Sequence, residues 1–413
     1  MRITSLLGIL VMLGLAFALC PRDRRRQVKL RPVLFGVGLL LLLAALLLRT
    51  PLNRLFDLAN TAVERLLGFS HDGASFVFGK LVDDPKSFGF IFAFQVLPTI
   101  LFFSALMSVL YHLRVMPFVV EKGGRFLSRV LGTSGAESFS TMADVFVGQT
   151  EAPLVIRPYL PTMTLSELNA CMVAGFATTA GGVLAAYVAM LSGKVPGIAG
   201  HLIACSVMSA PASLAIAKLM MPEVDTPQTG GDAQVSVPKT SANLLDAIAS
   251  GAIDGLRLAA NVGAMLIVFL ALTAMLNALL GWLGAAFGAQ LSLERLFGWA
   301  FSPLAWVMGV PANEAMKVGN LLGEKTVLNE FVAYSHLSEK LTQDPTWLSA
   351  RGRLITAYAL CGFANFGSIG IQIGGYSGLA PERRSDLSRL ALRAMIGGLL
   401  TTCLVASVAG LML

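Results

Sequence analysis

Two short polar clusters interrupt the apolar sequence, and their residue types could bind a polar solute. The first is Gly148-Gln149-Thr150-Glu151-Ala152-Pro153, and the second is Asn329-Glu330-Phe331. In the first, Gln149, Thr150 and Glu151 supply an amide, a hydroxyl and a carboxylate at consecutive positions. Such a set can pair with the mixed donor and acceptor edge of a heterocyclic base. Ionisable groups inside membrane segments are costly, so by default they mark a substrate or ion pathway.

The second half of the chain offers an acceptor-rich set. Glu330, Asn365 and Ser368 suit hydroxyl donors such as those of a sugar. An alternative interpretation is that these groups, like Glu151, only cap each other and the ends of broken helices.

Asp144 lies seven residues before Glu151, near the junction between a helix and the first polar cluster. A buried carboxylate there could ligate a sodium ion, or it could take up a proton, because burial disfavours the charged form. The alternative is a salt bridge, for instance with Arg157 or Lys317.

The composition indicates a polytopic membrane protein. The chain is 55% hydrophobic and only 13% charged, and its mean hydropathy is +0.72, whereas soluble domains carry about 25% charged residues. The net charge of +7 does not indicate nucleic-acid binding, because the basic residues gather in loops beside apolar runs. The positive-inside rule places residues 21–31 and 377–388 in the cytoplasm.

Apolar runs of about 20 residues predict eight transmembrane helices. The predicted spans are 3–20, 32–50, 88–112, 167–193, 198–220, 257–282, 350–376 and 389–412. Eight spans put both termini outside, with a short external amphipathic helix around Asn53–Leu67. The basic block Pro21–Arg26 follows the first span and favours a retained helix over lipoprotein-like cleavage at Cys20.

Residues 139–163 and 301–338 are too polar and too rich in proline to face lipid, yet too apolar for ordinary loops. Re-entrant hairpins fit that combination, because irregular backbone at membrane depth must line a cavity walled by protein. The predicted topology makes them enter from opposite sides, which indicates inverted repeats. Each is followed by a Gly-Phe-Ala triplet, at Gly175 and Gly362, where we predict broken helices.

Other patterns carry no chemistry. Residues 319–326 resemble a phosphate loop, but Glu324 replaces the second glycine and no strand precedes it. The four histidines and five cysteines lack metal-ligand spacing, so we expect no cofactor, no disulfide framework and no enzyme active site.

Three separated motifs resemble the signatures of the concentrative nucleoside transporters, in that family's order. They are the first cluster, Asn329-Glu330-Phe331-Val332-Ala333-Tyr334, and Gly362-Phe363-Ala364-Asn365-Phe366-Gly367-Ser368-Ile369-Gly370. Asn261-Val262-Gly263-Ala264-Met265 is also similar to that family. The resemblance covers roughly residues 85–413 and is typical of the bacterial branch.

This resemblance implies a homotrimer in which a mobile transport domain moves past a scaffold domain. Gln149, Thr150 and Glu151 would contact the nucleobase, with Val183 packed beside it. Glu330, Asn365 and Ser368 would hold the ribose, and Phe363 would line the pocket. Coupling-ion ligands by the same resemblance are Asp144, Val147, Thr178 and Thr179.

Sodium-dependent members usually carry Asn where this chain has Asp144, so we favour proton symport over sodium symport. A cation/proton antiporter without an organic substrate would explain Asp144 but would leave the amides and hydroxyls unused. A membrane enzyme acting on a lipid-linked nucleotide would call for a metal-binding acidic motif in a cytoplasmic loop. We therefore expect import of nucleosides, with membrane lipid and a trimer as the other partners.

The predicted segments form seven parts. They are 1–84 (N-terminal spans and external helix), 85–138 (scaffold and interfacial helices), 139–220 (first repeat), 221–256 (cytoplasmic linker), 257–300 (scaffold helix), 301–376 (second repeat) and 377–413 (loop and last span).

Overall fold

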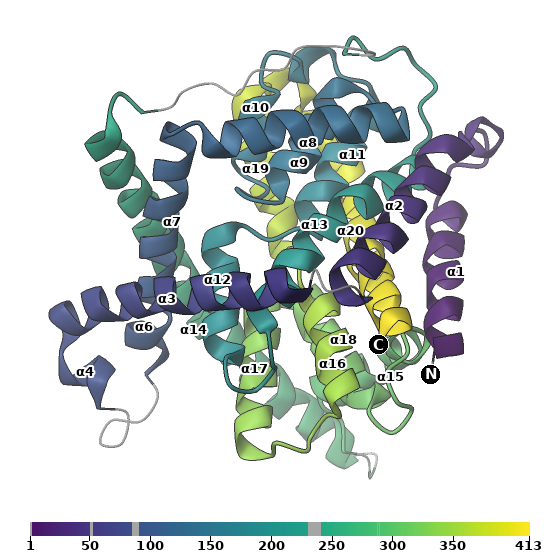
Figure 1. Cartoon of the computed structure of the whole chain (residues 1–413). Helices are drawn as coiled ribbons and strands as arrows, with labels where there is room; N and C mark the ends of the chain where they lie inside the picture. The colour runs from purple at the N-terminus through teal and green to yellow at the C-terminus, as the bar shows by residue number, and fades with distance from the viewer. Residues whose placement is uncertain (1, 50–52, 85–90, 230–240, 287, 289) are drawn as a thin grey trace.

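The computed structural model describes residues 2–49, 53–84, 91–229, 241–286, 288 and 290–413. All regular structure in these residues is helical, which confirms the predicted all-α class (Figure 1). The α-helices are α1 (Arg2–Ala18), α2 (Leu30–Arg49), α3 (Asn53–Phe78), α4 (Lys80–Asp83), α6 (Phe92–Gln95), α7 (Leu97–His112), α8 (Val115–Leu131), α9 (Gly135–Asp144), α10 (Ala152–Val155), α11 (Leu165–Ala177), α12 (Gly181–Leu191), α13 (Ile198–Met220), α14 (Leu244–Ala286), α15 (Leu293–Val307), α16 (Ala315–Val327), α17 (Glu330–Gln343), α18 (Ala350–Leu360), α19 (Phe366–Leu379) and α20 (Arg384–Met412). Short 3-10 turns are η1 (Arg25–Gln27), η2 (Leu160–Thr162) and η3 (Pro381–Arg383).

Each of the eight predicted spans falls on one of these helices or on a helix pair. Among the described residues, five segments are long and apolar enough to cross a membrane: Leu30–Arg49, Phe92–His112, Leu165–Leu191, Ile198–Met220 and Pro381–Met412. The last three are buried almost throughout, whereas the first two bury only a minor part of their surface. The protein is therefore a membrane-embedded bundle with its most apolar exposed faces on the peripheral helices.

Two helices are longer than the sequence indicated. Helix α14 begins at Leu244, so residues 244–256 of the expected cytoplasmic linker are part of the same helix as residues 257–282. Its 43 residues correspond to roughly 65 Å at about 1.5 Å per residue, more than a bilayer core requires. Helix α3, which the sequence predicted to be external, likewise runs to Phe78 and not to Leu67. In both cases small and polar residues that look loop-like in sequence are compatible with helix when neighbouring elements pack against them.

The two halves repeat one order of elements in opposite directions. In the first half the turn after α9 is followed by the helix pair α11–α12 and by α13; in the second, α16–α17 are followed by α18–α19 and by α20. Figure 1 places α9, α10 and α11 toward one end of the bundle and α16, α17 and α18 toward the other. This order and placement agree with the predicted inverted repeat, which stays a prediction.

The two hairpins differ from their expected bounds. The first begins at Gly135, and its second arm contains only the four-residue α10 before η2. In the second, α15 ends at Val307, and the arms are α16 and α17, which extends to Gln343. Prolines at 153, 158 and 161 prevent a long second arm in the first hairpin. The phosphate-loop-like residues 319–326 lie inside α16, so they form no loop.

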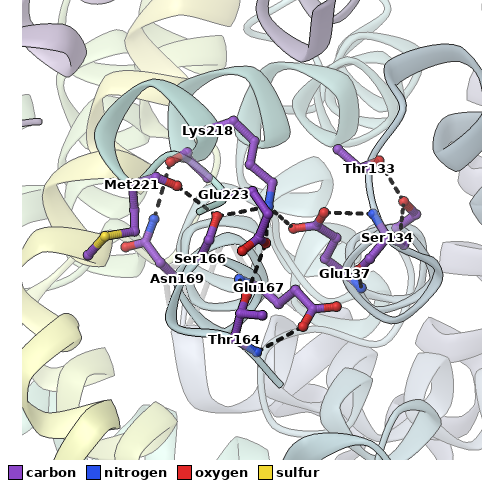
Figure 2. A network of polar contacts seen from close by, with 12 residues as sticks. Thr133, Ser134, Glu137, Thr164, Ser166, Glu167, Asn169, Lys218, Met221 and Glu223 are labelled. Carbon is purple, nitrogen blue, oxygen red and sulfur yellow. Dashed lines mark hydrogen bonds and ion pairs between the residues drawn. The ribbon is translucent and has the colours of Figure 1, made fainter. Parts of the chain in front are cut away.

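Buried charges anchor the start of α9 (Figure 2). Glu137 closes a capping box with Ser134, and Glu167 closes another with Thr164 at the start of α11. The Lys218 ammonium of α13 lies 2.7 Å from a Glu137 oxygen and donates to the Ser166 hydroxyl at 2.9 Å. Because Glu137, Ser166 and Lys218 are buried and joined by these contacts, they hold α9, α11 and α13 together at one end. The opposite end of α9 carries Asp144.

Helix α1 packs into the bundle against α20, α13 and α15. The Ser5 hydroxyl donates to the Met308 carbonyl at 2.9 Å, and Arg351 donates to both Ser5 and the Gly410 carbonyl. The two ends of the chain therefore lie at the same end of the molecule (Figure 1). All five cysteines are buried free thiols.

Candidate functional site

The first polar cluster lies on the turn after α9. Gly148 has φ +89°, and a Cβ there would lie 2.8 Å from the Ala180 Cβ, so only glycine allows this turn to approach the α11–α12 break. The Gly181 amide donates to the Phe146 carbonyl at 2.9 Å and fixes that contact. As a result Gln149 is buried, whereas Thr150 and Glu151 are exposed on the turn.

The second cluster begins α17. Asn329 caps this helix by accepting the Val332 amide proton, which places Glu330 in its first turn, where a negative charge is favourable. One Glu330 carboxylate oxygen, Oε1, accepts a hydrogen bond from the Tyr187 hydroxyl at 2.9 Å. The other, Oε2, accepts from the Asn365 amide, also at 2.9 Å. Glu330 is therefore buried with a defined orientation.

Asn365 connects the second cluster to the broken helix α18–α19. It is the N-cap of α19, and its Oδ1 accepts the Ser368 amide proton at 2.8 Å. Gly362, in the same break, has φ +133° and lies against the Ala177 carbonyl at the end of α11. The two broken helices therefore cross at their interruptions. Asn365 does cap a helix, as the structural alternative supposed, but its amide also bonds to Glu330.

Hydrogen bonds join the two clusters across the repeat boundary. The Gln149 Nε2 donates to the Ser368 hydroxyl at 3.1 Å, and the Gln372 Nε2 donates to the Gln149 Oε1 at 3.1 Å. The connected side chains are thus Tyr187, Glu330, Asn365, Ser368, Gln149 and Gln372. Asn365 and Ser368 are linked by the helix-capping bond to the Ser368 backbone amide, and the other links join side chains.

A cavity of about 640 Å³ opens between the two clusters. The structure brings together around it the eight residues predicted to contact base and ribose, and also Val147. The eight are Gln149, Thr150, Glu151, Val183, Glu330, Phe363, Asn365 and Ser368. Donors and acceptors from both repeats therefore face one space, with apolar surface from Val183 and Phe363 beside them. Their contact with a nucleoside stays a prediction.

Asp144 is completely buried and is not among the residues that line this cavity. Within the described residues neither of its oxygens has a hydrogen-bond partner, and it forms no ion pair there. Lys317, one of the cations considered for it, donates instead to the Trp347 carbonyl. An unpaired buried carboxylate is costly in its ionised form, so this position favours uptake of a proton or a cation.

The remaining predicted ion ligands have other contacts. The Thr178 hydroxyl donates to the Ala174 carbonyl at 2.9 Å, within the last turn of α11. The Thr179 hydroxyl lies 3.5 Å from the Cys361 sulfur, where the two breaks cross. Val147 lines the cavity. Among the four, only Asp144 supplies an unsatisfied side-chain oxygen.

Sequence reasoning missed Tyr187 and Gln372, which orient Glu330 and Gln149. It also missed the wall contributed by α7 and α14, which includes Tyr111 of α7 and the exposed ion pair of Asp254 and Arg257 on α14. A signal existed for Gln372, because a buried amide in an apolar helix seeks a polar partner. Tyr187 sits in an apolar run where a tyrosine is unremarkable, and the partners of α14 depend on tertiary packing.

Profiles of known families match three parts of the chain. Residues 7–81 match "Na+ dependent nucleoside transporter N-terminus", residues 93–194 match "Nucleoside recognition", and residues 201–410 match "Na+ dependent nucleoside transporter C-terminus". The chain belongs to the concentrative nucleoside transporter family. This family consists of transporters and not of enzymes.

Relatives of the transporter include bacterial and mammalian proteins. An uncharacterized transporter of Haemophilus influenzae is 44% identical over 99% of this chain and 97% of its own length. Human solute carrier family 28 member 3 is 42% identical and rat sodium/nucleoside cotransporter 1 is 43% identical, each over the whole chain. The chain spans 60% and 64% of the length of these two mammalian relatives.

The fold of the transporter matches that of CNTnw in an inward-facing, substrate-bound state. The TM-score is 0.93 at 44% identity, over 100% of this chain and 98% of that one. This confirms the transporter fold that the sequence motifs predicted.

Proposed function

We propose that this transporter imports nucleosides across the bacterial inner membrane by symport with a cation, and that the cation is a proton. The observation that carries the proposal is the cavity in which polar side chains of both repeats converge, with the unpartnered carboxylate of Asp144 behind it. Family membership supports nucleosides as the substrate class.

The cavity offers a distinct set of groups to each part of a nucleoside. Gln149, Thr150 and Glu151 supply donors and acceptors for the base, and Val183 packs against its face. The Glu330 oxygens accept from ribose hydroxyls, since each oxygen retains a lone pair beyond its protein hydrogen bond. Asn365 and Ser368 complete the ribose set, and Phe363 closes it on one side.

Asp144 acts as the coupling group. When protonated it is neutral, which suits its buried position, and it resembles the asparagine of sodium-dependent members in shape. Sodium is the second candidate, because the matched profiles and the rat relative carry sodium in their descriptions. In that case Asp144 ligates the ion, with Val147, Thr178 and Thr179 nearby. A cation/proton antiporter leaves the groups that line the cavity unused and is the weakest alternative.

The proposed assembly is a homotrimer in the lipid bilayer with both termini on the periplasmic side. The exposed apolar side chains of α14, among them Ile267 and Trp282, suit contact with lipid or with neighbouring subunits. Helices α7 and α14 belong to the proposed scaffold, past which both hairpins and both broken helices move.

The test is uptake of radiolabelled uridine and adenosine into proteoliposomes under an imposed proton gradient or an imposed sodium gradient. Accumulation with protons alone supports proton symport, and accumulation only with sodium replaces the proton by sodium. If neither nucleoside accumulates under either gradient, concentrative nucleoside symport is refuted for this chain.

A further inference from the structure

Three side chains from different elements meet where Gly175 lacks a side chain. A Cβ at Gly175 would lie 2.8 Å from the Gln372 Nε2, 3.0 Å from the Gln149 Cβ and 3.5 Å from the Asp144 Oδ1. Gln372 belongs to α19, Gln149 to the turn after α9, and Asp144 to the end of α9. The predicted cation site and the predicted base site therefore share Gln372 as a neighbour.

Gln372 is completely buried and uses only part of its hydrogen-bonding capacity. Its Nε2 donates to the Gln149 Oε1 and to the Met172 carbonyl, both at 3.1 Å. Its Oε1 has no partner within the described part of the chain. The same holds for both oxygens of Asp144. Each of these buried acceptors lacks a donor, and the Gln372 Nε2 and the Asp144 Oδ1 face the same point at Gly175.

We propose that Gln372 is a positioning residue that couples cation occupancy at Asp144 to nucleoside binding at Gln149. A cation at Asp144 neutralises the carboxylate whose Oδ1 faces the same point at Gly175 as the Gln372 Nε2. Gln372 then keeps its amide protons on Gln149 and Met172. With Asp144 ionised and unoccupied, its charge attracts the amide protons of Gln372 and removes a donor from Gln149.

The consequence extends to both substrate subsites. Gln149 also donates to Ser368, whose backbone amide is bound by Asn365, and Asn365 in turn donates to Glu330. Releasing Gln149 therefore loosens the base ligand directly, Ser368 through one further contact, and Asn365 and Glu330 through the two contacts that follow. The inference rests on the proposed symport and names the residue through which the two ligands influence each other.

Other titratable groups surround this region and must be separated from the effect. Cys171 of α11, Tyr376 of α19 and Tyr111 of α7 are within electrostatic reach of Asp144, and Glu151 lies on the same turn as Gln149. All four remain unchanged in a variant of Gln372, so a loss of cation dependence in that variant cannot come from their removal.

The test measures the dissociation constant of radiolabelled uridine, or of adenosine if uridine is not bound, on the purified full chain. It is measured at high and low proton concentration and with and without sodium. In the parent, cation occupancy should tighten binding by a factor of about 5 to 150, the usual range of coupling between two sites. Gln372→Met keeps the side-chain length but removes every hydrogen bond, and we expect the factor to fall to about 1 while nucleoside binding persists.

Thr356→Val is the matched control, because among the described residues the buried Thr356 hydroxyl bonds only within its own helix, to the Gly352 carbonyl. In this control, cation occupancy should tighten nucleoside binding by the same factor as in the parent, which is called the cation factor below. If Gln372→Met is not monodisperse, Gln372→Leu removes the same hydrogen bonds and takes its place. In the Asp144→Asn background, Gln372→Met should change the cation factor no further.

The outcomes separate the inference from the function on which it rests. A Gln372→Met protein that binds nucleoside with the parent's cation factor overturns the inference alone. A folded variant that binds no nucleoside also overturns it, because Gln372 would then be a substrate ligand. A parent that binds nucleoside without any cation dependence refutes the symport proposal itself, and the inference with it.

Discussion

Replacing Tyr187 by phenylalanine tests whether nucleoside binding depends on the hydrogen bond that orients Glu330. The substitution removes one hydroxyl and leaves the ring, which stacks on Tyr334 with centroids 4.3 Å apart and meets Phe331 edge-on at 5.6 Å. The packing of α12 against α17 should therefore survive. Only the hydrogen bond from the Tyr187 hydroxyl to the Glu330 Oε1, 2.9 Å long, is lost.

The size of the effect follows from the partners of that carboxylate. A hydrogen bond to a charged group contributes about 1.5–3 kcal/mol. Glu330 keeps its second partner, Asn365, and it lines the cavity, where water can replace part of the lost contact. We therefore expect the lower end, about 1.5 kcal/mol, which weakens nucleoside affinity about tenfold.

The assay is equilibrium binding of uridine and of 2′,3′-dideoxyuridine to parent and variant. The dideoxy compound lacks the hydroxyls that Glu330 is proposed to accept, so its affinity should change by less than about twofold. Tyr334→Phe is the control, because the Tyr334 hydroxyl donates to the Ala357 carbonyl at 2.6 Å and not to Glu330. Parent-like affinity of Tyr187→Phe for uridine, or equal losses for both ligands, would refute the reasoning.

Three further predictions concern the same region. Glu330→Gln should weaken nucleoside uptake roughly 100-fold without unfolding, because two charge-assisted hydrogen bonds of about 1.5–3 kcal/mol each become neutral ones; near-normal uptake kinetics would remove Glu330 from the ribose site. Asp144→Asn should flatten the decline of uptake with rising external pH, because the carboxylate that loads the proton is gone, and a parent-like pH profile would exclude Asp144 as the proton site. Gly175→Ala should destabilise the protein by about 1–3 kcal/mol, since its Cβ would lie 2.8 Å from the Gln372 Nε2 and 3.0 Å from the Gln149 Cβ. Gly370→Ala, whose Cβ would have nothing within 4 Å, should leave the stability unchanged. Equal melting temperatures of the two variants in detergent would contradict the prediction.

The sequence predicted the helical class and the positions of the spans because long apolar runs are explicit in it. It also identified the polar residues of the two clusters that line the cavity, since Gln149 and Glu330 are polar groups in apolar surroundings, whereas Val183 and Phe363 came from the family resemblance. The lengths of α3 and α14 were underestimated, because small and polar residues leave the choice between loop and helix to packing. The supporting side chains Tyr187 and Gln372 were missed because only the crossing of two distant repeats gives them partners.

The contact between α1 and α20 constrains the order in which this protein can be made. About 370 residues separate the end of α1 from the start of α20, which at about 5–20 residues per second corresponds to roughly 20 to 70 s of synthesis. Throughout that interval the face of α1 that later packs on α20 has only lipid or the insertion machinery against it. The anchor at Arg351, Ser5 and Gly410 can close only when the last helix arrives. Ribosome-stalled or C-terminally shortened chains should consequently leave α1 undocked and open to quality-control proteases.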